Sequence, residues 1–128
     1  MKKTYLLLII TIVLFSCGQQ KKPQGAKIAF ENTECNIGKI KQGEHTECCF
    51  TVKNIGDSTL FFNQIIPSCD CTSFVNVNDN VPAGQSYTLK FMLDTYGKEL
   101  GAFESDIRII TNTIPDLHKL TIKAEIEE

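Results

Sequence analysis

Residues 44–54 read EHTECCFTVKN, and apolar and polar side chains alternate along them. Cys48, Phe50 and Val52 fall on one face. The other face carries His45, Glu47, Cys49, Thr51 and Lys53. Successive side chains of a β-strand point to opposite faces, so this stretch predicts a strand with one buried face.

The same period of two recurs along the chain, and no sustained helical period interrupts it. The further strands are expected at residues 27–31, 59–66, 73–77, 87–93, 103–111 and 117–126. Seven short strands, with turn residues every eight to twelve positions, are typical of two packed sheets. We therefore predict an all-β domain at 26–128, a seven-stranded immunoglobulin-like β-sandwich. A barrel is the structural alternative.

The first residues have the features of an export signal. Lys2 and Lys3 precede an apolar run at 5–15, which is too short to cross a bilayer. The run ends in Leu14-Phe15-Ser16-Cys17, which resembles the bacterial lipobox. This pattern predicts removal of residues 1–16 as a lipoprotein signal peptide and lipidation of Cys17. The alternatives are an ordinary secretory signal and an uncleaved anchor.

Residues 18–25 read GQQKKPQG, a polar segment without an apolar anchor. We interpret 17–25 as the lipidated cysteine followed by a flexible tether. Acidic residues after the lipidated cysteine, which direct some lipoproteins to the cell surface, are replaced here by Gln19, Gln20, Lys21 and Lys22. The expected location is the cell envelope, with the domain lipid-anchored to a bacterial membrane and facing the periplasm.

Charge and composition exclude some functions. The chain has 13 basic and 15 acidic residues, and loss of Lys2 and Lys3 with the signal peptide leaves 11 against 15. A net charge of −4 argues against nucleic acid as a partner, because no basic surplus neutralises phosphates. No nucleophile elbow, phosphate-binding glycine loop or zinc-protease motif occurs, so we do not expect an enzyme.

Cysteines remain the most informative residue type. Five follow Cys17, at positions 35, 48, 49, 69 and 71. An exported domain forms disulfides, but five thiols leave at least one unpaired, bound to a metal or joined to another molecule. Cys35, Cys48, Cys49, Cys69 and Cys71 are all candidate disulfide participants, and their pairing stays open.

A longer string points to a family. The segment 50–57 (FTVKNIGD) is followed by Ser68-Cys69-Asp70-Cys71-Thr72, by Val81-Pro82-Ala83-Gly84 and by Gly101-Ala102-Phe103. This string resembles the bacterial domain-of-unknown-function family numbered fifteen seventy-three. Its members are small immunoglobulin-like exported domains akin to ASH/Hydin and major-sperm-protein sandwiches. The resemblance implies the fold and the compartment but no activity.

The sequence departs from that family in its cysteines. Asp70 stands where the family usually has glycine, and Cys35, Cys48 and Cys49 are additions. Strand alternation predicts that the connections at 35–43, 67–72 and 95–101 share one end of the sandwich. Cys35, Cys69 and Cys71 would then gather at one end with His45, while the tether enters at the other.

Two classes of function follow from this arrangement. We favour a non-enzymatic binding, adaptor or structural domain without a cofactor, which offers a sheet edge or loops to an unidentified protein partner. The alternative is a periplasmic thiol-redox or soft-metal protein acting through Cys69-Asp70-Cys71. Cys35 and His45 would help to hold Cu(I) or Zn(II) in the metal version. A bridge between cysteines two apart would be strained and easily reduced, although Asp70 disfavours the thiolate.

Overall fold

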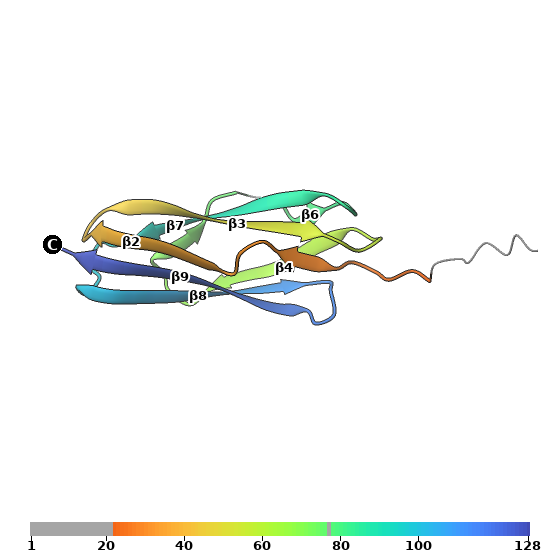
Figure 1. The fold of residues 1–128 in the computed structure, drawn as a ribbon. Helices are drawn as coiled ribbons and strands as arrows, with labels where there is room; N and C mark the ends of the chain where they lie inside the picture. Colours follow the sequence, from red (N-terminus) through yellow and green to blue (C-terminus); the bar gives the residue numbers. More distant parts are fainter. Residues whose placement is uncertain (1–21, 77) are drawn as a thin grey trace, which may run out of the picture.

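Alternating apolar side chains fill the space between two sheets in the computed structural model, which describes residues 22–76 and 78–128 (Figure 1). The largest fully buried side chains come from strands of both sheets: Phe50, Val52, Leu60, Val81, Leu89, Phe91, Leu93, Ile107, Ile109, Leu120, Ile122 and Ile126. The predicted signal peptide and Cys17 lie outside the described residues.

The first sheet has four strands in the order β1 (Ile28–Phe30), β3 (His45–Asn54), β7 (Ser86–Asp94) and β5 (Thr72–Phe74). All neighbours in it are antiparallel. At its centre Cys48 lies opposite Phe91, and Phe50 lies opposite Leu89. All four of these side chains are inaccessible to solvent, as the alternation at 44–54 predicts.

The second sheet has five strands in the order β2 (Glu34–Lys41), β9 (Leu117–Glu127), β8 (Gly101–Thr111), β4 (Leu60–Pro67) and β6 (Asn80–Val81). The β2–β9 pair is parallel, and the other pairs are antiparallel. The long β8–β9 ladder joins ten residue pairs in unbroken register, from Gly101↔Ile126 to Ile110↔Leu117.

The predicted all-β, two-layer architecture is confirmed, but the count of seven strands is wrong, because the described residues form nine. Two stretches of chain each change sheets on their way along the sandwich. The first contributes β1 to the four-stranded sheet and then β2 to the other. The second contributes β5 and then β6 in the same way. The chain thus runs along the length of the sandwich seven times, and two of these runs are each divided into two strands, which gives nine strands.

The sandwich has two ends, which we call poles (Figure 1). The N-terminal pole holds the turns at 55–59 and 112–116, which hydrogen bonds between Asn112 and the start of β4 connect. The C-terminal pole holds the β2–β3 turn, the loop at 95–100 and the end of β9. Gln42 of that turn donates its backbone N–H to the carbonyl of Glu127.

The chain before β1 is fixed to the N-terminal pole. The backbone N–H groups of Gln24 and Gly25 donate to the carboxylate of Asp57 at 2.7 and 2.8 Å. These bonds, first the one from Gln24, lower the pKa of Asp57 below its usual value of 3.8. Residues 24 and 25, which the sequence interpretation counted as tether, therefore contact the folded body.

No helix within residues 22–76 and 78–128 is long and apolar enough to cross a membrane.

Candidate functional site

Cys35 and Cys48 form a disulfide between the two sheets, with a Cα–Cα distance of 6.1 Å. Cys35 lies on β2 opposite Ile122, and Cys48 lies on β3 with no solvent exposure. The bridge has a sequence separation of 13, and its Cys35 end is partly buried against the core that contains Cys48. The position of this disulfide indicates that it stabilises the fold and is not a reactive centre.

Cys69 and Cys71 form the second disulfide, with a Cα–Cα distance of 5.1 Å. It lies where the chain leaves β4 and crosses to β5 in the other sheet, a segment that we call the crossover (residues 68–71). Cys71 is buried, while Cys69 is partly exposed and packs against the core. The Nζ of Lys98, in the loop at 95–100, lies 3.5 Å from the carboxylate of Asp70.

Cys49 is the unpaired and exposed cysteine of the described residues. It faces outward, as predicted, because its neighbour Cys48 points into the core. His45 is exposed and lies 3.4 Å from the carboxylate of Asp94, its partner across the β3–β7 ladder.

The sequence interpretation placed Cys35 with Cys69 and Cys71 at one end, and this grouping is wrong. Cys35 sits on β2, a strand that the interpretation treated as a connection, and it is bonded to Cys48. Cys69, Cys71 and His45 do lie toward the C-terminal pole, since the carbonyl of Cys71 accepts the N–H of Asp94. Within residues 22–76 and 78–128 no group of three or more His, Cys, Asp or Glu is placed to hold a metal.

The crossover ends the pairing of β4 with β8 halfway along β8. The last pair is Pro67↔Ile107, and the N–H of Ser68 then donates to the carbonyl of Asp106 at 2.7 Å. Ser68 also accepts the N–H of Asp106 through its Oγ at 3.0 Å. Beyond this point β8 continues toward the C-terminal pole with β9 on one side and no strand on the other.

The free half of β8, residues 101–105, exposes backbone groups that strands normally pair. In an antiparallel ladder the N–H and C=O of alternate residues point to the same side. Those of Asp106 face Ser68, so those of Ala102 and Glu104 face the same open side. None of the described residues bonds to them there. We call this row the β8 open edge.

Side chains around the β8 open edge are of mixed character. Phe103 is partly buried and packs against the core from the inner face of β8. Ala102 and Glu104 are exposed on the outer face. A small hollow beside the crossover is lined by Asp70, Cys71, Asp94, Tyr96 and Lys98. The open edge therefore combines free backbone groups with an apolar inner side and a charged rim.

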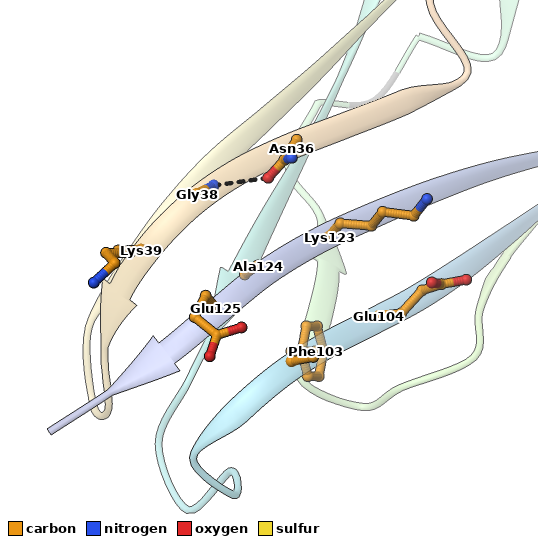
Figure 2. Close-up of a pocket in the computed structure, with 9 residues that line it drawn as sticks. Asn36, Gly38, Lys39, Phe103, Glu104, Lys123, Ala124 and Glu125 are labelled. Carbon is orange, nitrogen blue, oxygen red and sulfur yellow. Dashed lines mark hydrogen bonds between the residues drawn. The ribbon is translucent and has the colours of Figure 1, made fainter.

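The outer edge of β2 is another free edge in the described part of the chain, and it is distorted. The register between β2 and β9 shifts between Asn36 and Lys39, where Gly38 takes a φ of 76°. The Oδ1 of Asn36 accepts the N–H of Gly38 at 2.9 Å (Figure 2). Such bulges disrupt the straight row of donors and acceptors that an added strand needs.

The bulge leaves a shallow hollow on the outer face of β2, β9 and β8, shown in Figure 2. Lysines and glutamates surround it, so side chains of both charges are present. Lys39 pairs with Glu127 at 3.2 Å, and Lys123 pairs with Glu34 at 2.6 Å. The hydrogen bond from Lys123 to Glu34 raises the pKa of the lysine above 10.5. Two lysines, Lys39 and Lys123, and two glutamates, Glu104 and Glu125, line the hollow, so its lining has no excess of one sign for an ionic ligand.

These features define an immunoglobulin-like β-sandwich domain, with two packed sheets and edge stretches that change sheet. The chain belongs to the family described as Protein of unknown function (DUF1573), whose family model matches residues 28–126. The resemblance seen in the sequence is thereby confirmed. A search of curated proteins finds no significant match to the chain.

Solved structures show the same fold at low identity. A protein of unknown function from Porphyromonas gingivalis W83 is 19% identical with a TM-score of 0.69, over 86% of this chain and 51% of that one. PapD-like domain 7 of human CEP192 is 10% identical with a TM-score of 0.66, over 86% and 92%. The periplasmic chaperone SfaE is 10% identical with a TM-score of 0.60, over 80% and 58%. This chain spans about half of the Porphyromonas protein.

Sequence reasoning proposed sheet edges in general but did not identify Ala102 and Glu104. The sequence does contain a signal for this open edge. Pro67 and the crossover cysteines end β4, whereas the alternation that forms β8 begins well before the residues that face β4. A strand longer than its neighbour leaves a free edge.

Proposed function

We propose that this protein is a non-enzymatic, lipid-anchored binding domain of the cell envelope. It binds an extended segment of a partner protein as an added strand on the β8 open edge. The observation that carries this proposal is the unpaired row of backbone groups at Ala102 and Glu104. Strand addition uses main-chain hydrogen bonds for affinity and alternate side chains for specificity.

The surroundings favour one kind of segment. An added strand would continue the line of β4, because β4 pairs with the same side of β8 up to Pro67. Its inward side chains would meet Phe103 and the Cys69–Cys71 bridge, so apolar residues at alternate positions are expected. Its outward side chains would lie beside Glu104, which favours a basic residue there.

The anchor supports the same arrangement. The lipobox at Leu14–Cys17 attaches the chain to a membrane on the side of the N-terminal pole, where Gln24 leaves the body. The β8 open edge lies in the half of the molecule toward the C-terminal pole, near the loop at 95–100. A domain attached in this way faces the periplasm with its open edge directed away from the bilayer.

Proline substitution tests the open edge without breaking the β8–β9 ladder. The N–H of Glu104 faces the open side, so Glu104→Pro removes a donor that only a partner would use. A photoreactive residue at Ala102 should form a discrete adduct with the partner in the producing cells. The adduct should disappear in Glu104→Pro and persist in Glu104→Ala, which keeps the backbone N–H.

The same photoreactive residue at Lys90 is the positional control. Lys90 is exposed on the outer face of the other sheet, and we expect no shared adduct from it. Circular dichroism should show the same β-sheet spectrum for all variants. An adduct at Ala102 that survives Glu104→Pro would refute strand addition at this edge.

A further inference from the structure

The turn between β8 and β9 holds Ile114 in a fixed, fully exposed position. Ile114 is 100% exposed in this turn at the N-terminal pole. Beneath it the Oγ1 atoms of Thr111 and Thr113 lie 2.7 Å apart, and Thr113 Oγ1 lies 2.9 Å from Nε2 of His118. Thr113 Oγ1 also donates to the carbonyl of Pro115 at 2.6 Å. Buried hydroxyl groups thus support a turn that directs a large apolar side chain into solvent.

A second isoleucine projects from the neighbouring turn. Ile55 is 56% exposed directly after β3. Its turn is held by the buried side chain of Asn54, which accepts the N–H of Gly56 at 3.0 Å and donates to the carbonyls of Ser58 and Val81. Two rigid turns therefore each expose an isoleucine at the same pole.

The chain toward Cys17 leaves the body between these turns. Lys27 accepts the N–H of Ile55 through its carbonyl at 2.9 Å. Gly25, Ala26, Lys27 and Ile114 together line a small cleft. Gln24 is fixed to Asp57, so six residues separate it from Cys17, and this connection spans at most about 25 Å.

We propose that Ile55 and Ile114 rest in the interfacial layer of the bilayer that anchors the protein, so that the N-terminal pole sits on the membrane. This inference rests on the lipid anchor of the proposed function. An anchor within about 25 Å keeps this pole next to the headgroups, and apolar side chains partition into that layer. Lys27, Asp57 and Asp116 give the pole charges of both signs, so the contact is apolar and independent of anionic lipid.

The sequence contains no tryptophan, so one substitution installs a unique fluorescent probe. The full-length lipidated protein carrying Ile114→Trp is reconstituted into phosphatidylcholine vesicles, with or without brominated phosphatidylcholine. We expect a blue-shifted emission and loss of intensity with the brominated lipid, unchanged by high salt. Ile55→Trp should behave in the same way. Leu100→Trp, half-exposed at the C-terminal pole, is the matched control and should keep a solvent-exposed, unquenched emission.

The outcomes separate this inference from the proposed function. Protein that floats with the vesicles while Ile114→Trp stays unquenched, or is quenched no more than Leu100→Trp, refutes the membrane contact and leaves the anchor intact. Protein that does not float with the vesicles refutes the anchor and the contact together.

Discussion

At Gly56 the turn after β3 packs directly against the backbone that enters β1. A Cβ atom at this position would overlap the carbonyl oxygen of Gly25 and lie 2.5 Å from the amide nitrogen of Lys27. Both are main-chain atoms held by hydrogen bonds. The carbonyl of Gly25 accepts the N–H of Asp57, and the N–H of Lys27 donates to Oδ1 of Asn54, so neither atom moves easily. Because Gly56 has only a hydrogen atom in place of a side chain, residues 24–27 can pack against this turn.

Gly56→Ala should therefore destabilise the domain by about 1–3 kcal/mol, as overpacking of a rigid site does. Urea denaturation measures this change. Ser58→Ala, in the same turn, adds no atom and should cost much less. Faster amide exchange at Gln24 and Gly25 in Gly56→Ala would accompany the loss. A denaturation midpoint equal to that of the wild type would show that the turn relaxes freely.

His118 gives the N-terminal pole a dependence on pH. Partial burial against the ring of Phe30 and beside Thr113 lowers the pKa of His118 below 6.5, and the nearby Asp116 only partly opposes this. The unfolded chain therefore binds a proton at higher pH than the folded chain does. Stability is unaffected well above 6.5 and falls as the pH drops from 6.5 toward the folded pKa.

The matching experiment compares the wild type with His118→Asn in thermal unfolding at several pH values on either side of 6.5. On acidification the melting temperature of the wild type should fall further than that of the variant, since the other titrating groups act equally in both proteins. Parallel pH profiles for the two proteins would exclude His118 as a source of the dependence.

At the scale of elements, the Cys35–Cys48 bridge is a disulfide cross-link between the two sheets. A bridge over 13 residues restricts the unfolded chain, so Cys35→Ala with Cys48→Ala should lose about 3 kcal/mol of unfolding free energy. Cys49→Ala, next to it but exposed, should change it by less than about 0.5 kcal/mol. Urea denaturation without reductant measures both, and equal losses would contradict a structural role for the bridge.

The strands also show which parts of the fold the sequence pattern predicts. Residues 44–54 and 87–93 alternate without interruption and form the central strands as predicted. Strand β2 was missed because its alternation shifts at Gly38, where the bulge changes the phase of the inward residues from Cys35 and Ile37 to Ile40. Strand β6 has only two residues, too few to show any period.

The candidate site was less predictable for a different physical reason. An odd number of cysteines predicts an unpaired one, but which thiols meet depends on the sheet that each strand joins. Cys35 was misplaced because the change of sheet between β1 and β2 is determined by tertiary packing, which the alternation of residues does not reveal. The open edge at Ala102 and Glu104 likewise arises from the unequal lengths of β4 and β8, which only the assembled sheet reveals.

Across the whole molecule, the attachment of the chain and the β8 open edge lie toward opposite poles, and the strands run between them (Figure 1). A pulling force applied between the proposed membrane anchor and a partner bound at the proposed site would therefore act parallel to the strands. The ladder bonds lie across that direction and would be loaded in shear, many at once. Strand orientation thus suits the domain to the proposed role of holding a partner protein under tension.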